Sequence, residues 1–356
     1  MVVASTMYAI AWLLLSFTFP LIGVLYHYSY FLIGLLGMTS NIPFFIAALI
    51  YLRSNVKMLN IGMRVTPYAV AAITVVFFFM KSNLFIMLLI LSSFIQAFFW
   101  ISIEISLSFM EGSGNAEKYS ISWGFPMAIA PIIAGIVIQD YGFPFVFIIS
   151  VFFFIMAGLF SPKIKQNVEK RASTKLNIAL ILPLMFSGMS LGFALYVLIP
   201  FLKTEGFSYI IVGAIEAIFS ITQALMFLVL NFVKKNNIVK FSVISALFSS
   251  SPLFLFFGIN IYSVFVLVTM AGVGSSIAFS KVLSYTSASM SPRKGIFYYE
   301  FFSAIGFGIG SSVDGAIFQF LKLGPAVIIF TVPIIYAIVL VASNNIKKSY
   351  KAIKSA

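Results

Sequence analysis

The sequence predicts an all-α polytopic membrane protein whose twelve transmembrane helices form two pseudo-symmetric six-helix bundles. Three observations lead to this prediction: the composition is 62% hydrophobic and 9% charged, basic residues gather at alternate ends of the apolar segments, and two sequence patterns recur about 180 residues apart. A soluble domain of this length, 356 residues, needs far more polar surface than such a composition provides. A membrane protein is therefore expected.

The composition also excludes several kinds of chemistry. With no Cys and one His, the chain has no thiolate or His-based metal site, and we expect neither metal nor cofactor. No nucleophile–base set or phosphate-binding loop is visible, which argues against an enzyme. The net charge of +13 lies in the short polar segments between apolar runs, so we assign it to the lipid bilayer surface and not to nucleic acid.

Twelve apolar segments have the length of about 20 residues that a membrane span requires. The first has no cleavage site and is expected to remain as a span. The predicted spans are Thr6–Tyr26, Phe31–Leu52, Asn60–Met80, Leu84–Phe109, Tyr119–Ile138, Phe143–Phe160, Leu176–Leu202, Ser208–Val233, Val239–Phe257, Ile261–Ser289, Gly295–Phe320 and Gly324–Ala342.

The basic residues set the predicted orientation. Of the 22 Lys and Arg residues, 18 lie at one set of span ends, and basic residues mark the cytoplasmic side. We therefore expect a multi-pass protein of the cell membrane with both termini in the cytoplasm. Residues 1–160 form the first half, 161–175 a basic cytoplasmic linker, and 176–356 the second half with a short cytoplasmic tail.

The two halves share sequence. The second spans begin with matching phrases, and the fifth and eleventh spans match near their ends, which indicates a parallel six-plus-six repeat typical of secondary transporters. The matched pairs are Pro20/Pro200, Ser29/Ser208, Tyr30/Tyr209, Gly34/Gly213, Gly135/Gly315, Gln139/Gln319 and the turns Gly142/Pro144 and Gly324/Pro325.

With these features the chain resembles the major facilitator superfamily over nearly its whole length. The stretch "ALIYLRSNVK" is similar to that family's loop motif between helices 2 and 3. It keeps Arg53 and Lys57, and it places Asn55 at a Gly position, where we expect a left-handed backbone that Asn tolerates. Ala48 and Leu52 replace the motif's first Gly and its Asp, so the charge relay attributed to that Asp is not expected.

A second resemblance lies on the fifth span. There "APIIAG" retains Pro131 and Gly135 of a motif that the family associates with antiporters. The resemblance implies a monomeric secondary active transporter that moves a small-molecule solute by alternating access. Few charges and many aromatic residues favour proton-coupled efflux of an amphiphilic compound. Uptake of a sugar or organic acid, or a non-transporting sensor or assembly role, remains open.

Ionisable side chains within spans are functional candidates because burying them costs several kcal/mol. Glu104 and Lys281 lie at pseudo-equivalent places of the fourth and tenth spans, so we predict a cytoplasmic gate ion pair for which Glu300 competes. There is an alternative for each residue. Glu104 reaches the lipid headgroups, Lys281 extends its side chain to the membrane interface, and Glu300 is stabilised by the helix dipole in the first turn of its helix.

Two further carboxylates are predicted to couple transport to protons. Glu216 lies in a span without a cation predicted at its depth, and an apolar environment favours the neutral form of a carboxyl group. Asp314, in the outer half of its span among several glycines, ranks behind it. A protonated Glu216 bonded to a neighbouring helix is the structural alternative. For the substrate cavity we predict Gln96 and Trp100, which share a face of the fourth span, and Tyr196 on the seventh.

Overall fold

The structure is a computed structural model that describes residues 1–79, 82–108, 115–164, 177–233, 237–282, 284–285, 291–321 and 327–355. Within these ranges the chain is helical, with turns and no strand. Among the described residues, eleven segments are long and apolar enough to cross a membrane, and a shorter apolar helix, Ile328–Asn344, follows them. The predicted all-α polytopic fold is confirmed. Most of the predicted linker, residues 165–175, and the Gly324/Pro325 turn lie outside the described residues.

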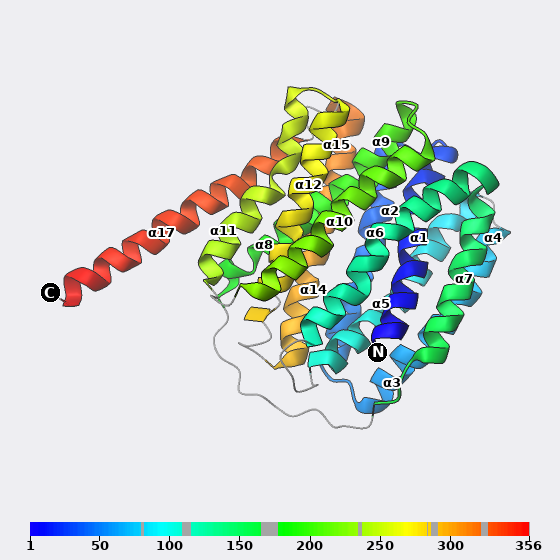
Figure 1. Cartoon of the computed structure of the whole chain (residues 1–356), viewed down its shortest axis with the longest axis horizontal. Helices are drawn as coiled ribbons and strands as arrows, with labels where there is room; N and C mark the ends of the chain where they lie inside the picture. Colours follow the sequence, from blue (N-terminus) through cyan, green and yellow to red (C-terminus); the bar gives the residue numbers. More distant parts are fainter. Residues whose placement is uncertain are drawn as a thin grey trace.

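In the first half, α1 packs against α6 and α7, α2 against α5, and α4 against α7 (Figure 1). The helices are α1 (Val2–Leu25), α2 (Tyr30–Tyr51), α3 (Val56–Arg64), α4 (Thr66–Phe78), α5 (Ser82–Ser108), α6 (Asn115–Tyr141) and α7 (Phe143–Phe160).

In the second half, several spans change helix type along their length. The elements are η1 (Ile178–Leu180), α8 (Leu182–Phe193), η2 (Ala194–Leu198), α9 (Ile199–Thr204), α10 (Tyr209–Phe232), α11 (Ile238–Ser249), η3 (Ser251–Phe257), α12 (Ile261–Ile277), η4 (Ala278–Val282), α14 (Pro292–Gly308), η5 (Ile309–Val313), α15 (Asp314–Leu321), η6 (Ile328–Thr331) and α17 (Val332–Ser355). Helix α8 packs against α14, α12 lies between α10 and α11, and α17 packs on α11.

The helix bundle has two ends. The linker face carries Met1 and the turn between α2 and α3, and it lies at the bottom of Figure 1 near α3. The far face carries the turns between α1 and α2 and between α9 and α10, at the top of the same view.

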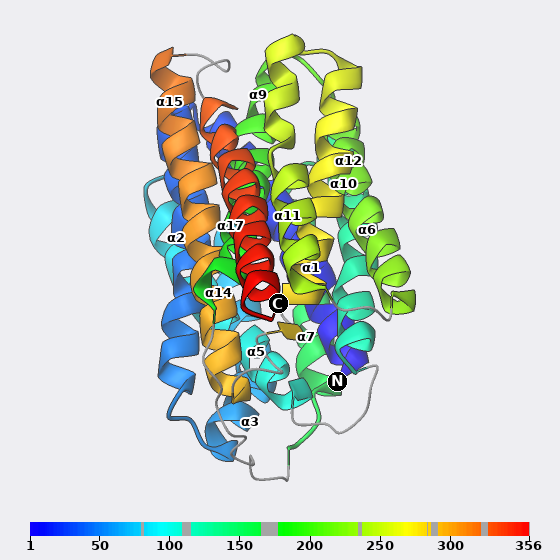
Figure 2. The ribbon, with the colours of Figure 1, turned by 90° about the vertical axis from the view of Figure 1, so that its left-hand side faces the viewer.

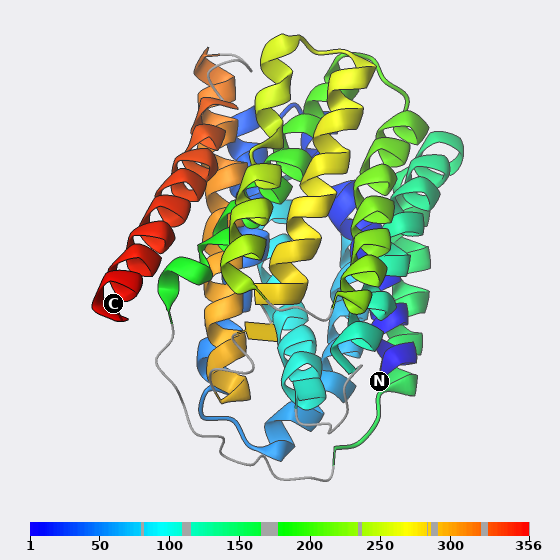
Figure 3. The same ribbon diagram turned by 60° about the vertical axis from the view of Figure 1, so that its left-hand side comes forward.

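The halves meet along two helix pairs. Helix α2 packs against α14, η5 and α15, which run beside it in Figure 2, and α6 packs against α10, as Figure 3 shows at the right of the molecule. These pairs are equivalent under the repeat, because α2 corresponds to α10 and α6 to the α14–α15 span.

Several predicted helix boundaries differ from the structure by a few residues, and two of the differences have a clear physical reason. The third span begins at Val56 instead of Asn60 and is interrupted at Val65, because Pro67 has no amide hydrogen to continue the backbone ladder. The last helix runs to Ser355, well past the predicted end at Ala342. Its apolar run ends there, but no Gly or Pro follows Pro333 to break the helix.

The turns that end α1 and α9 are equivalent. The amide of Tyr28 donates to the Gly23 carbonyl (2.9 Å) and that of His27 to Val24 (3.0 Å), which forms a Schellman motif with His27 left-handed at φ 55°. The second turn has the same bonds, Phe207 to Leu202 (3.1 Å) and Gly206 to Lys203 (3.1 Å), with Gly206 at φ 91°. The repeat thus preserves the turn, but the left-handed position is His27 in the first copy and Gly206 in the second.

Replacing His27 with Gly is expected to stabilise the protein by about 1 kcal/mol, because a left-handed backbone costs a residue with a Cβ roughly that amount. The measurement is the midpoint of thermal unfolding in detergent. Gly206→His is the matched control and should destabilise the protein, since no atom lies within 4 Å of an added Cβ there and only backbone strain is introduced. Unchanged stability in both variants would refute this account.

Candidate functional site

The described part of the second half contains three five-residue π-helical segments, and each holds or adjoins a predicted site residue. Tyr196 lies in η2, Lys281 in η4, and Asp314 follows η5 directly. A π segment widens the backbone ladder and rotates the side chains that follow it, and such segments occur frequently at functional sites. The described residues of the first half contain no π segment.

A pair of carboxyl groups joins the two halves on the side of the linker face. A side-chain hydrogen bond connects Glu104 on α5 with Glu300 on α14, where Glu300 is buried. Tyr299 is close enough to interact electrostatically with both. The pair adjoins an apolar cluster that includes Ile101 and Ile105 of α5 and Ile296 of α14. Because a carboxylate has no proton to donate, a hydrogen bond between two carboxyl groups forms only while one of them is protonated.

Lys281 contacts the end of α10. Its Nζ donates to the carbonyl of Leu230 (2.9 Å) and to that of Val233 (3.4 Å), and it lies 5.5 Å from the centre of the Phe241 ring. A cation at a helix C-terminus satisfies carbonyls that have no partner within the helix. In this conformation Lys281 thus caps α10 and Glu104 bonds to Glu300. The Glu104–Lys281 ion pair stays a prediction.

Tyr196 and Glu216 lie on facing parts of the second half. The Tyr196 hydroxyl lies 3.1 Å from Ser40 Oγ of α2, a contact across the two halves, and it interacts electrostatically with Glu216. Glu216 is buried, and its Oε2 has no hydrogen-bond partner among the described residues. It lines a small, otherwise apolar cavity of about 10 Å³ between α10, α12 and the α8–α9 span, close to the smallest volume that admits one water.

Asp314 is fully buried at the start of α15. Neither of its carboxyl oxygens has a hydrogen-bond partner among the described residues. A buried polar group without a partner costs free energy, so its retention needs an explanation in ligand, proton or water binding.

The predicted cavity residues of α5 belong to an aromatic cluster. The Trp100 ring lies edge-on to the rings of Tyr8 and Trp12 of α1, with ring centres 5.5 Å and 6.0 Å apart. The ring centre of Trp12 lies 6.4 Å from that of Phe44 of α2. Gln96 is buried, its Nε2 donates to Ser92 Oγ (2.9 Å), and its Oε1 has no partner among the described residues. The sequence reasoning missed Tyr8 and Trp12, although their spacing of four residues places them on one helix face.

The loop-motif residues lie at the linker face. The predicted left-handed backbone at Asn55 is wrong. The Asn55 backbone is extended (φ −112°, ψ 175°), and its side chain accepts a hydrogen bond from the Met58 amide (3.0 Å). It caps α3, a role that Asn fills well and Gly fills less well. Arg53 and Lys57 are exposed on either side of this cap.

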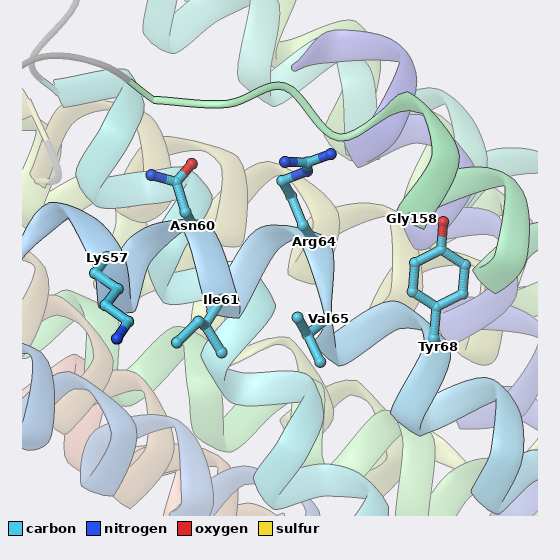
Figure 4. A pocket seen from close by; sticks show the side chains of 7 residues that line it. All are labelled: Lys57, Asn60, Ile61, Arg64, Val65, Tyr68 and Gly158. Atoms are coloured by element: carbon cyan, nitrogen blue, oxygen red, sulfur yellow. The ribbon is translucent and has the colours of Figure 1, made fainter.

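Lys57 also lines a basic pocket of about 450 Å³ between α3, α4 and the end of α7. Figure 4 shows Asn60 and Arg64 pointing toward the segment after α7, where Asn60 accepts from the Ile164 amide (2.8 Å) and donates to its carbonyl (3.1 Å). The Tyr68 ring lies against Gly158. The pocket is open.

The residues of the helix 5 motif lie where the halves meet. A Cβ added at Gly135 would lie 2.5 Å from the Tyr209 carbonyl of α10, and the Pro131 carbonyl lies against Gly213. Their positions give this motif a packing role at the contact of α6 with α10.

No protein-family model matches the chain, and no curated protein matches it either. Solved structures do. The human organic anion transporter MFSD10 (TETRAN) aligns with a TM-score of 0.67 and 12% identity over 95% of this chain and 97% of its own. The nucleoside transporter NupG aligns with a TM-score of 0.68 and 16% identity over 96% and 98%.

A bacterial homologue of the human lysosomal transporter Spinster, solved in an inward-facing and occupied conformation, aligns with a TM-score of 0.65 and 13% identity over 96% of this chain and 94% of its own. The chain therefore has the fold of the major facilitator superfamily transporters, as its sequence resemblance predicted.

Removing the hydroxyl in Tyr196→Phe is expected to cost about 1 kcal/mol, because Ser40 Oγ then loses one of its hydrogen-bond partners. A double-mutant cycle with Ser40→Ala, read from thermal unfolding, should give a coupling energy of similar size. Tyr262→Phe, on a ring that is 80% exposed, is the control and should change nothing. Additive effects of the two single changes would show that the contact contributes no stability.

Proposed function

We propose that the protein is a secondary active transporter that moves a small solute across the membrane by alternating access. One observation carries the proposal: two equivalent helix pairs join the two repeat-related halves. The halves have a transporter fold, and buried carboxyl groups lie near these helix pairs. Such halves can rock against each other without breaking their own cores. The linker face is the cytoplasmic one, because basic residues gather there.

The carboxyl pair supports proton coupling. Glu104 and Glu300 belong to different halves, so separation at the linker face breaks their hydrogen bond and exposes both groups to water. A proton that holds the pair together would then be free to leave. Glu216 and Asp314 are further proton sites in this proposal, deeper in the second half.

The aromatic cluster supports an amphiphilic solute. Tyr8, Trp12 and Trp100 combine ring faces with polar edges, which suits a compound with an apolar body and a few polar groups. The direction we propose is efflux, with uptake of a sugar or organic acid as the second candidate. The solved neighbours transport organic anions and nucleosides, so both classes belong among the test solutes.

The test is transport by the purified protein in proteoliposomes that contain a pH-sensitive dye. Organic anions, nucleosides, sugars and lipophilic cations are added under pH gradients of both signs. One solute class should cross the membrane together with a change of internal pH, and the productive sign of the gradient would distinguish efflux from uptake. No solute or proton movement under any condition would favour the sensor or assembly role.

Glu104→Gln is expected to remove the pH dependence of closure at the linker face. In the natural pair closure needs a proton, so it is present at low pH and lost as both carboxyl groups ionise; an amide at 104 donates to Glu300 at any pH. The measurement is the distance between spin labels at Lys163→Cys and Lys294→Cys, from about pH 5 to about pH 9.

In the labelled protein with Glu104 unchanged, the distance between the two spin labels should increase as the pH rises. In the labelled Glu104→Gln variant it should stay constant. Glu205→Gln, at an exposed carboxyl on the far face, is the matched control and should behave as the unchanged protein. A Glu104→Gln variant that keeps the full pH response would exclude the pair from coupling.

A further inference from the structure

We propose that Gln139 and Gln319 are positioning residues that hold the far face closed, because each caps the first amide of a helix that belongs to the opposite half. The proposal rests on the alternating-access function proposed above and names the contacts that set one of its two states. Both residues lie at repeat-equivalent positions near the ends of α6 and α15.

The first cap joins α15 to α2. Helix α2 begins at Tyr30, and the Ser29 side chain accepts from the Leu32 amide (3.2 Å). This leaves the Tyr30 amide as one of the helix-terminal donors that have no partner within the helix. Gln319 Oε1 accepts from that amide at 2.9 Å, across the boundary between the halves.

The second cap repeats the arrangement with the halves exchanged. Helix α10 begins at Tyr209, and Ser208 accepts from the Ile211 amide (3.3 Å). Gln139 Oε1 of α6 accepts from the Tyr209 amide at 3.2 Å. A two-fold relation between the halves requires such pairs, because a contact from one half to the other must recur in the opposite sense.

The backbones lie close enough at these points to fix the geometry of both caps. A Cβ on Gly315 would lie 2.6 Å from the Tyr30 carbonyl, and one on Gly135 would lie 2.5 Å from that of Tyr209. Each glycine precedes its Gln by one helical turn. The caps therefore form only while α15 lies against α2 and α6 against α10 at the far face.

The caps suit a contact that must open and close. Both Gln side chains are exposed, so water replaces either hydrogen-bond partner when the halves separate. One more bond crosses the boundary nearby, between the Tyr30 hydroxyl and Thr204 Oγ1 (2.6 Å). Exposed bonds between neutral groups each contribute little, which keeps the open state accessible.

The experiment measures the far face directly. Because the chain has no Cys, spin labels can be placed at Tyr141→Cys and Phe320→Cys, two exposed positions next to the caps in opposite halves. The variants are Gln139→Met and Gln319→Met, which keep the side-chain length but remove the acceptor. Each should raise the ratio of open to closed molecules about fivefold, and the double variant about 30-fold.

Gln→Glu at both positions is the conservative rescue. A carboxylate accepts from the same amide and is favoured at a helix N-terminus, so this variant should stay closed like the unchanged protein. Asp140→Asn, an exposed change beside Gln139, is the matched control and should leave the distance distribution unchanged. A double Met variant with the unchanged distribution, or a Glu variant that opens like Met, would overturn the proposal.

The labelled distances need no solute, so this result and the transport test can fail separately. If the Met variants open the far face while no solute moves, the caps stand and the proposed transport fails. If a solute moves and the Met variants stay closed, the caps alone are refuted.

Discussion

The close contact of two repeat-related helix pairs is the constraint on which the rest of the structure depends. Helix α2 of the first half lies against α14 and α15 of the second, and α10 of the second half lies against α6 of the first. The same kind of contact therefore occurs twice across the boundary, with the roles of the two halves exchanged. Backbone carbonyls approach glycines at these crossings, and in a bilayer such packing is a main source of helix association. The glycines are Gly34, Gly135, Gly213 and Gly315. A side chain at any of these four positions would push the halves apart.

Two of the buried carboxyl groups lie next to these crossings along the chain: Asp314 directly precedes Gly315, and Glu216 follows Gly213 by three residues. The π segments η2 and η5 carry or precede Tyr196 and Asp314, and both segments belong to the second half. The first half contributes regular helices, the aromatic cluster on α1 and α5, and Glu104. In the described residues the π segments lie in the second half, so the polar groups on the two sides of the site differ although the halves share one fold.

The two ends of the bundle are held by different chemistry. At the far face the bonds are neutral, from helix amides to Gln139 and Gln319, and they do not depend on a proton. Near the linker face Glu104 and Glu300 require one. In the proposed mechanism a change in proton activity acts on the bond between Glu104 and Glu300 and not on the two Gln caps. In the proposed transporter this difference would let a proton gradient bias the rocking motion, because a ligand shifts an equilibrium only by its unequal binding to the two states.

The all-α polytopic fold, the repeat and the Ser-Tyr helix starts followed from the sequence alone, because a bilayer fixes span length and requires every backbone group to find a partner within the protein. Side-chain partners did not follow. The sequence did not predict that Asn55 caps α3 with an extended backbone, or that Lys281 caps α10 from within the π segment η4, while the Glu104–Lys281 ion pair stays a prediction. A π segment rotates all later side chains about the helix axis, and only the packing of neighbouring helices decides where such a segment forms.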